Sequence, residues 1–455
     1  MRTTMRMRAV TVAALAALTA RCAPGADEAP AAGGGERFER PGVTADRAAR
    51  QVRVEAACTG LKPGMREREF FVIAPNSGRD YEAYAIARAK PSDVHAALEF
   101  IGLKPGRPVD DERMMYWPKG ERVRIFVDVP PDRARTADGQ PVPPRFRLEE
   151  AILDTRTGKP LPADGFVFVG SYWKEGGESG REYAADVEDP SALAAAFNLP
   201  NVVLDIPRMG GKSELYPHQV LNPERDLPAD TPLTLVLEPD PAPGGGPRAL
   251  DLVARAAPDG EGLRVRIVDA SGATIADAGS TDEAAAYLDG RRREGRDVFL
   301  AVEPADDLAL PALERLARWV DDLSLNRDVR IEPPPDGHLY HRAFAPNPDF
   351  RARETRPAQP CELHLRRAAG GGIEGRLLRI DRVSDPEAGT ATFTETAHPA
   401  STPEEARDNL LAHGPRLPVL LVFADAATTY GELRAFLRPI RTTHSVVYVF
   451  PTAAP

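Results

Sequence analysis

Three side chains in the first half of the chain are of the types that enzymes use to break bonds. His95 is a candidate general base, Ser171 a candidate nucleophile and Glu82 a candidate acid. A hydrolase or lyase needs such groups to converge in one pocket, with the nucleophile hydrogen-bonded to a base. His95 lies off the apolar stripe of a predicted helix and four residues before Glu99, which favours a surface ion pair. The sequence therefore predicts no catalytic residue.

A polar turn between two predicted strands is the best candidate for a binding loop. It presents Asn76, Ser77 and Arg79, and Tyr81 and Glu82 follow directly. A guanidinium beside amide and hydroxyl groups can hold a carboxylate or the end of a peptide. The alternative is a solvated hairpin loop. The predicted binding residues are Asn76, Ser77, Arg79, Tyr81, Glu82, His95 and Ser171.

Aromatic side chains in predicted loops are a second candidate surface. Tyr172, Trp173 and Trp117 could form a shelf for a sugar or a peptide. Core packing is the favoured interpretation, because large aromatic rings are more often buried than exposed.

Two further patterns suggest cofactor sites but do not meet the requirements for them. The run Gly-Gly-Lys-Ser at 210–213 lacks the earlier glycine of a phosphate-binding loop. His338, His341, Cys361 and His364 are zinc-binding residue types, but the first pair lies in a Pro-rich stretch. Cys361 and His364 fall on opposite sides of a predicted strand. We therefore expect no metal and no cofactor.

Composition limits the classes of partner. The chain has 455 residues, of which 58 are basic and 68 acidic, so the formal net charge is −10. This charge disfavours binding to nucleic acid or to an anionic membrane surface. The hydrophobic content of 42% is sufficient for several domain cores.

The N-terminus has the features of an export signal. Basic residues precede an apolar stretch at 9–20 that is too short for a permanent membrane helix, which predicts a signal peptide over 1–21. Cys22 raises the question of a lipid anchor, although Thr19 and Arg21 match a lipoprotein signal poorly. We expect an exported protein, periplasmic or anchored to the envelope, with no transmembrane span in the mature chain. Whether Cys22 carries lipid stays open.

Composition shifts and periodicity predict an α+β fold with three folded units. They predict a flexible tether at 22–47, a β-rich domain at 48–242, a repeat at 248–332, a Pro-rich extended linker at 333–359 and a second repeat at 360–452. In the first domain, apolar runs at 70–73 and 81–89 predict two strands joined as a hairpin, with a helix that Ser92 caps. Pairing of Cys58 with Cys361 stays open, since sequence cannot show proximity.

The C-terminal half contains an internal repeat. Capping boxes at 280–283 and 401–404 each open a helix, and an apolar strand follows each helix. The second helices carry matching stripes, in which Leu313, Leu316 and Val320 correspond to Leu433, Phe436 and Ile440 at a constant offset of 120. The predicted order in each copy is β-β-α-β-α-β.

Several runs in the first domain resemble the YdjY-type domain family of bacterial exported proteins. They are EFFV at 69–72, DYEA at 80–83, AKPSDVHAAL at 89–98, GLKPG at 102–106, FVGS at 168–171 and YAAD at 183–186. Family members often carry His where Tyr81 stands, so chemistry that needs that His is not implied. The resemblance brings no catalytic residues.

Each C-terminal copy is similar to the periplasmic domain of the ExbD/TolR family. The second copy is nearer, through PVLLVFAD at 418–425 and TYGEL at 429–433, whereas the first has Leu310-Pro311 in place of Tyr-Gly. The resemblance implies domains that pair and that bind peptidoglycan or a periplasmic partner. Proton-driven work is not implied, because the acidic membrane helix of the family does not precede either copy.

Together these observations predict a non-catalytic exported envelope protein that binds or scaffolds peptidoglycan or a periplasmic or membrane protein. One alternative is a hydrolase or lyase of an envelope polymer that uses the first domain. A second is an accessory to an ExbB/ExbD-type motor.

Overall fold

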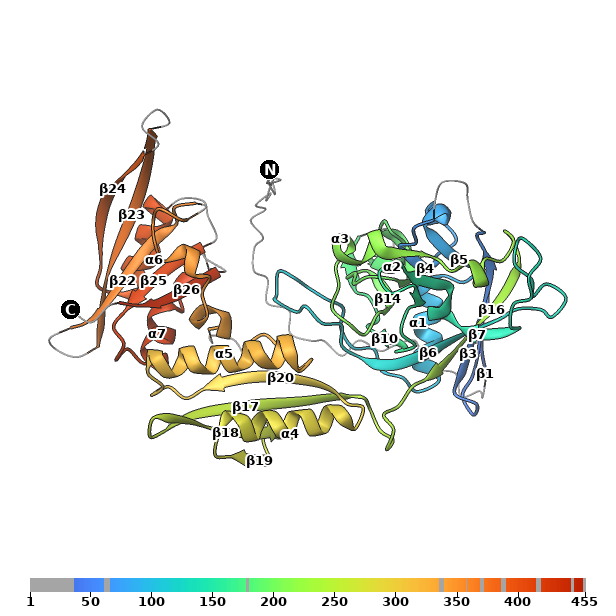
Figure 1. Cartoon of the computed structure of the whole chain (residues 1–455), viewed down its shortest axis with the longest axis horizontal. Helices are drawn as coiled ribbons and strands as arrows, with labels where there is room; N and C mark the ends of the chain where they lie inside the picture. The colour runs from blue at the N-terminus through green and yellow to red at the C-terminus, as the bar shows by residue number, and fades with distance from the viewer. Residues whose placement is uncertain are drawn as a thin grey trace. The chain divides into compact units, whose positions relative to one another are not determined.

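The computed structural model describes residues 37–60, 66–176, 180–334, 339–356, 358–368, 372–385, 390–414, 419–442 and 446–452. Cys22 and the predicted signal peptide lie outside these residues. The fold contains both strands and helices and is rich in strands, which form a mixed eight-stranded barrel and further sheets (Figure 1).

The first domain is built on the barrel. Its strands, in order around the sheet, are β3 (Gln51–Cys58), β16 (Pro232–Pro239), β6 (Glu121–Asp128), β10 (Phe166–Phe168), β14 (Val202–Asp205), β13 (Ala192–Ala195), β4 (Phe70–Ile73) and β5 (Ala83–Ala87). Pairing of β5 with β3 closes the ring. The pairs β13/β14 and β4/β5 are parallel and the other neighbours are antiparallel.

Shorter elements surround the barrel. The helices are α1 (Pro91–Phe100), α2 (Ala184–Val187) and α3 (Lys212–Leu215). The remaining strands are β1 (Arg37–Arg40), β2 (Val43–Asp46), β7 (Arg145–Arg147), β8 (Ile152–Asp154), β9 (Lys159–Pro160), β11 (Trp173–Glu175), β12 (Arg181–Tyr183) and β15 (Gln219–Leu221). Strands β1 and β2 extend the sheet from β3, and Val43 and Ala45 are buried in the core. The predicted tether at 22–47 is therefore wrong from residue 37 onward.

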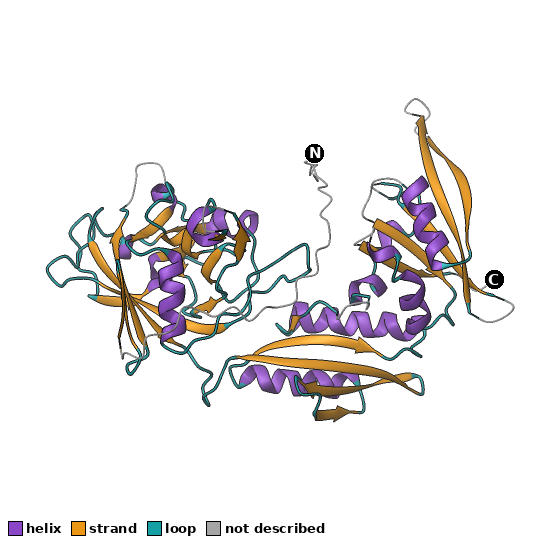
Figure 2. Ribbon diagram, turned by 180° about the vertical axis from the view of Figure 1, so that it is seen from behind, coloured by secondary structure: helices purple, strands orange, loops and turns teal. Residues whose placement is uncertain are grey.

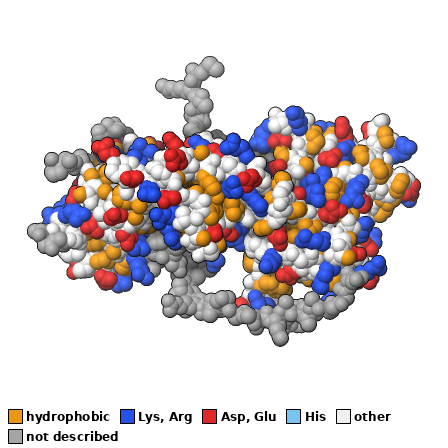
Figure 3. All heavy atoms as spheres, turned by 90° about the horizontal axis from the view of Figure 1, so that it is seen from below, with side chains coloured by type: hydrophobic (Ala, Val, Ile, Leu, Met, Phe, Trp, Pro, Cys, Tyr) orange, Lys and Arg blue, Asp and Glu red, His pale blue; other side chains and the backbone are white. Residues whose placement is uncertain are grey.

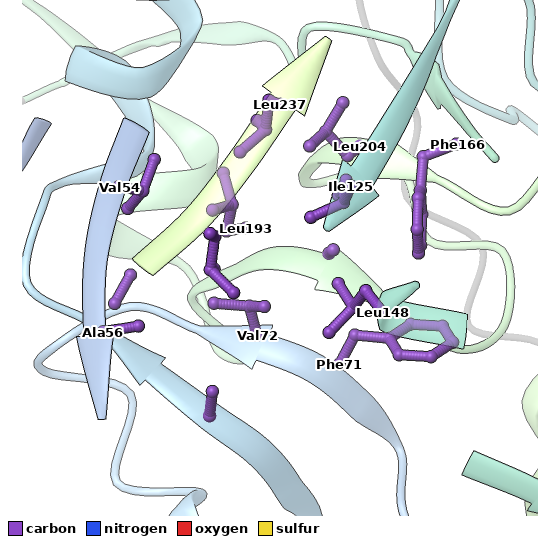
Figure 4. Close-up of a cluster of buried hydrophobic side chains, with 14 of the residues drawn as sticks. Val54, Ala56, Phe71, Val72, Ile125, Leu148, Phe166, Leu193, Leu204 and Leu237 are labelled. Atoms are coloured by element: carbon purple, nitrogen blue, oxygen red, sulfur yellow. The ribbon is translucent and has the colours of Figure 1, made fainter. Parts of the chain in front are cut away.

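Side chains pointing into the barrel form the core of the first domain. Alternation along β3 buries Val52, Val54 and Ala56, and Phe71 of β4 and Ile125 of β6 belong to the same core. Figure 4 shows Val54, Ala56, Phe71 and Ile125 in this cluster. A closed barrel has no free edge, and this period-2 burial is the pattern that such strands require.

The predicted hairpin at 70–89 is wrong. Strand β4 runs parallel to β5, with Phe70 opposite Ala83 and Ile73 opposite Ile86. The connecting chain therefore returns along the sheet instead of making a tight turn. Both strands are buried on both faces over most of their length, so apolar character alone could not indicate which edges would pair.

Helix α1 covers one side of the barrel with its predicted apolar stripe, since Val94, Ala97 and Leu98 are buried. It begins at Pro91 with Lys90 as the N-cap, so Ser92 is not the cap. The Ser92 backbone N–H and hydroxyl instead donate to the Asp186 carboxylate at 2.9 and 2.5 Å.

Each C-terminal copy is a five-stranded sheet with two helices along it (Figure 2). The first copy contains β17 (Ala249–Asp259), β18 (Gly262–Asp269), β19 (Thr274–Ala278), α4 (Thr281–Arg293), β20 (Asp297–Pro304), α5 (Leu310–Asn326) and β21 (Arg330–Ile331). The second contains β22 (Cys361–Arg367), β23 (Ile373–Asp385), β24 (Thr390–Ala400), α6 (Pro403–His413), β25 (Val419–Ala424), α7 (Tyr430–Leu437) and β26 (Val446–Pro451). The order is β-β-β-α-β-α-β, so the predicted order omitted the first strand of each copy.

The helix caps refine the repeat alignment by one residue. Ser280 caps α4, but Thr402 and not Ser401 caps α6. In each case the glutamate three residues later accepts from the backbone N–H before the cap, Gly279 in one copy and Ser401 in the other. The equivalent caps are thus 122 residues apart, since 402 − 280 = 122.

The two copies pair through the turns that precede α5 and α7. Ala309 and Thr429, equivalent at the offset of 120, form an antiparallel bridge. The Leu310 N–H donates to the Thr428 carbonyl at 3.0 Å, and the Tyr430 N–H donates to the Leu308 carbonyl at 2.8 Å. Because equivalent residues exchange these bonds, the contact has local two-fold symmetry. The two copies also share one hydrophobic core, which confirms the expectation that they pair.

The Pro-rich segment between the copies is not a simple extended linker. Leu339, Ala343 and Phe344 are buried in the shared core, and Arg356 is buried against Glu362 of β22 at 2.6 Å. The sequence showed only that this segment is rich in proline. The contacts that hold it on the second sheet are made by single side chains, such as Arg353 and Arg356 to Glu362, and they leave no periodic pattern.

Cys58 and Cys361 are both free and buried, so they do not pair with each other in the structure. Burial raises the pKa of each thiol to about 11. Both therefore behave as small apolar side chains in their cores.

Asp205 on β14 supplies a test of the barrel core. The residue is fully buried, and burial raises the pKa of its carboxyl well above the usual value. Its Oδ1 accepts from Asn198 Nδ2 at 3.1 Å and from the Ile206 N–H at 2.7 Å, whereas Oδ2 has no partner among the described residues. The folded state therefore holds a proton more tightly than the unfolded state, and this contribution to stability is lost as the pH rises above about 4.

We predict that Asp205→Asn gains stability relative to the parent protein as the pH rises, because Asn keeps the accepting oxygen and carries no charge. Urea unfolding of both proteins at several pH values between 4 and 8 measures this difference. A difference that does not change with pH would contradict the buried, protonated state of Asp205.

Candidate functional site

His95, Tyr183 and Gly170 form a linked set at one side of the barrel. His95 Nδ1 lies 2.8 Å from the Tyr183 hydroxyl, which donates to the Gly170 carbonyl at 2.7 Å. The imidazole also packs edge-on against Phe168 and Tyr183, with ring centroids 5.1 and 5.4 Å away. Helix α1 positions the histidine, and the β11–β12 hairpin positions the tyrosine.

These bonds determine the tautomer of His95. Burial raises the pKa of Tyr183 far above its usual range, so the phenol keeps its single proton. That proton is used at Gly170, and the phenol oxygen must accept from His95. Nδ1 therefore carries a hydrogen, and Nε2 is left facing Glu99 at 3.5 Å. Nε2 then has no hydrogen to donate, so its contact with Glu99 becomes an ion pair only when the imidazole is protonated.

Ser171 lies beside this set but is not hydrogen-bonded to it. The residue has a φ of +50°, in the left-handed region, directly after Gly170 at +78°. Its Oγ is buried and has no hydrogen-bond partner among the described residues. A nucleophilic serine requires a base within hydrogen-bond reach, and the proton-accepting position of His95 points to Glu99 instead.

The exposed surface outside this set is aromatic. Trp173 is 53% exposed, Val187 49% and Tyr172 37%. The Trp173 ring packs on Tyr183 with centroids 5.0 Å apart, and the Tyr172 hydroxyl donates to Glu188 at 2.6 Å. We name Trp173, Tyr172 and Val187 the aromatic ledge, in which ordered contacts support Trp173 and Tyr172. The expectation that Tyr172 and Trp173 pack in a core is wrong.

Glu82 belongs to a different cluster of charges. Arg79 makes a paired contact with Asp189, at 2.9 Å for both Nε and Nη2, and donates to Glu82 at 3.2 Å. The buried Glu69 is salt-bridged to Lys212 and lies 3.7 Å from Arg79. Burial, and then the charge of Glu69, raises the pKa of Glu82. Arg79 is therefore already neutralised and is a poor anchor for a further carboxylate.

The remaining predicted binding residues flank that cluster. Asn76 is exposed, and Ser77 is half-buried with an N–H that donates to the Ala74 carbonyl at 3.2 Å. The Tyr81 carbonyl accepts from the buried Arg68 at 3.3 Å. The structure thus divides the seven predicted residues into two groups, with His95 and Ser171 in one and the other five around Arg79.

Of the four zinc-type residues, His338 lies outside the described residues, and the other three are used for packing and salt bridges. His341 is buried and lies 3.3 Å from Asp321, and burial lowers the pKa of its imidazole. His364 Nε2 lies 2.9 Å from Glu362. Within the described ranges, no group of three or more His, Cys, Asp or Glu side chains could hold a metal ion.

Sequence reasoning missed the role of Tyr183. It lies 88 residues from His95, and its run at 183–186 was noted only as part of a family resemblance. A buried tyrosine needs a hydrogen-bond partner, but the sequence cannot say which residue supplies it.

Figure 3 shows acidic and basic side chains interspersed over the face that it draws. Among the helices of the described residues, none is long and apolar enough to cross a membrane.

Comparisons with known proteins add no relative. No family model matches the chain, and no curated protein matches it. Solved structures of the protease–reverse transcriptase of prototype foamy virus, one native and one a mutant, align with 45% of this chain and 36% of theirs. The identities are 9% and 10% and the TM-scores 0.14 and 0.13, so these similarities carry no argument about fold or function.

We predict that Tyr183→Phe destabilises the first domain by about 1–3 kcal/mol, because it leaves the buried Gly170 carbonyl and His95 N–H without a partner. Urea unfolding measures the loss. Tyr172→Phe is the matched control, since its hydroxyl is at the surface and should change stability by about 0.5 kcal/mol or less. Equal effects of the two changes would mean that the linked set contributes nothing to stability.

Proposed function

We propose that this protein is a non-catalytic, exported binding protein of the cell envelope that holds peptidoglycan, with the aromatic ledge as a principal contact. The signal-peptide pattern at 1–21 and the YdjY-like and ExbD/TolR-like runs support this assignment at the level of sequence resemblance. A periplasmic protein partner is the alternative ligand.

The observation that carries the proposal is that the rings of the aromatic ledge are exposed, whereas Tyr183 beneath them is buried and hydrogen-bonded. Trp173 is half exposed on a support made by the buried Tyr183 ring. Exposed, rigid aromatic rings provide large contact areas for sugars and peptides at low entropic cost. The Trp173 ring packs on Tyr183 and lies 5.7 Å from the Arg181 guanidinium, yet about half of its surface stays exposed.

The same contacts argue against the hydrolase alternative. The Nδ1 atom of His95 is bonded to the Tyr183 hydroxyl, its Nε2 atom faces Glu99, and the Ser171 hydroxyl is buried with no hydrogen-bond partner among the described residues. Glu82, the third residue of that alternative, is held in the Arg79 cluster. A hydrolytic site would need these contacts to be rebuilt on substrate binding.

The test is co-sedimentation of the chain from residue 37 onward with purified peptidoglycan. Trp173→Ala should weaken binding about tenfold, equivalent to about 1.4 kcal/mol for one aromatic contact. Leu325→Ala is the matched control, because Leu325 is 77% exposed on α5 and lies in another domain. Thermal unfolding checks that both variants fold.

Three outcomes would count against the proposal. Absence of sedimentation by the parent protein would exclude peptidoglycan and direct attention to a protein partner. Sedimentation unchanged by Trp173→Ala would exclude the ledge as the contact. Release of soluble fragments by the parent protein but not by Ser171→Ala would establish the hydrolase alternative.

A further inference from the structure

The outer face of the second sheet, opposite its helices, carries a row of side chains that is mostly aromatic and includes one arginine. Strand register places Phe450, Phe423, His364, Arg376 and Pro399 side by side on five neighbouring strands. Phe450 stacks on Phe423 with centroids 5.4 Å apart, and Phe423 stacks on His364 at 4.9 Å. The row thus combines apolar ring surface with one guanidinium.

The segment between the copies covers the neighbouring row and stops there. Phe350 packs on Tyr448 with centroids 5.5 Å apart, and Arg353 and Arg356 both bind Glu362. Glu362 is 2% exposed beneath them. Beyond this cover, the face is hollowed into a groove of about 710 Å³ whose lining includes His364, Arg376 and Pro399 (three of the row).

Arg376 is the one side chain of this groove with an uncompensated positive charge. Arg366 is salt-bridged to Glu374 at 2.7 Å, and the Asp425 carboxylate accepts from the Thr452 hydroxyl at 3.2 Å. Arg376 is exposed and has no ion-pair or hydrogen-bond partner among the described residues. An exposed guanidinium is well suited to a planar carboxylate, which it can bind with two parallel hydrogen bonds.

The first copy provides an internal comparison. At the equivalent register positions it has Glu303, Arg255, Arg266 and Asp277. Arg255 binds Glu303 at 3.0 Å, and Asp277 lies 2.9 Å from Arg264 and 3.7 Å from Arg266. A groove of about 390 Å³ adjoins Arg255, Arg266 and Glu303. A ligand carboxylate would have to compete there with carboxylates that are already in place.

We propose that the groove of the second copy, and not its counterpart in the first, binds a carboxylate of the ligand through Arg376. This inference rests on the proposed function, in which the carboxylate belongs to peptidoglycan. His364 and Pro399 supply the apolar surface on which the chain or ring next to that carboxylate packs, and Phe423 stacks on His364 outside the groove lining.

The first experiment compares Arg376→Gln with the matched control Arg266→Gln in the full chain from residue 37. Co-sedimentation uses purified peptidoglycan, either untreated or with its carboxylates converted to amides. Arg376→Gln should weaken binding to untreated material about tenfold, the loss expected for one charge-assisted contact. Arg266→Gln should stay within about twofold, and amidation should abolish the difference between parent and Arg376→Gln. Equal binding by parent and Arg376→Gln would overturn the inference and leave the proposed function standing.

The second experiment does not depend on peptidoglycan binding. N-acetylmuramic acid, which carries a carboxylate, and N-acetylglucosamine, which lacks one, are titrated while NMR follows the His364 ring signals, assigned with His364→Gln. The parent and Arg266→Gln should respond to the acid only, and Arg376→Gln should not respond. No response of the parent, equal responses to both sugars, or displacement by inorganic phosphate at lower concentration than the acid would overturn the assignment to a carboxylate.

Discussion

Charged groups that leave water must find partners, and this constraint determines how the parts of the described chain fit together. Asp297 of the first copy is held by Arg122 of the barrel at 2.8 and 2.9 Å and by Arg330 at 2.9 Å. Although burial alone raises it, the pKa of Asp297 lies below its usual range because of these two cations. The buried ion pair of Glu362 and Arg356 joins the second sheet to the segment that precedes it in the same way. Removing one partner of such a set would leave a buried charge, so each set fixes the position of two elements at once.

Local signals in the sequence were sufficient for the two copies but not for the barrel. Helix caps and apolar stripes are encoded over a few residues, and the offset of 120 between Leu313 and Leu433 identified the repeat. Strand β22 alternates Leu363 and Leu365 with polar residues and was predicted as a strand, but nothing local assigned it to the repeat. The barrel closes by pairing β3 with β5, and β13 with β14 in parallel. These contacts depend on which strand edges pair. Strands buried on both faces have no alternation of apolar and polar residues, so their sequence does not indicate their neighbours.

The candidate site shows the same limit at the level of single side chains. Sequence reasoning chose His95 and Ser171 by their chemistry, and the structure does place them in one neighbourhood. The Tyr183 hydroxyl accepts a hydrogen bond from Nδ1 of His95, so this nitrogen cannot accept a proton from Ser171. Residue types therefore selected two residues that the fold brings near each other. The hydrogen bonds of Tyr183 to His95 and Gly170, which hold its ring beneath Trp173, join residues far apart in the sequence and could not be predicted from it.

The repeat allows the charge pairing in one copy to be compared with that in the other, and the difference bears on ligand binding. The two copies have the same order of strands and helices, so the side chains at matched register positions can be compared. In the first copy, Arg255 and Arg266 face carboxylates of their own chain, and the charge is satisfied without a ligand. In the second, His364 and Phe423 replace the Arg255–Glu303 pair, and Arg376 is left to the solvent. A solvated guanidinium costs the fold little, and it is also the one group in that groove that gains most from a ligand carboxylate.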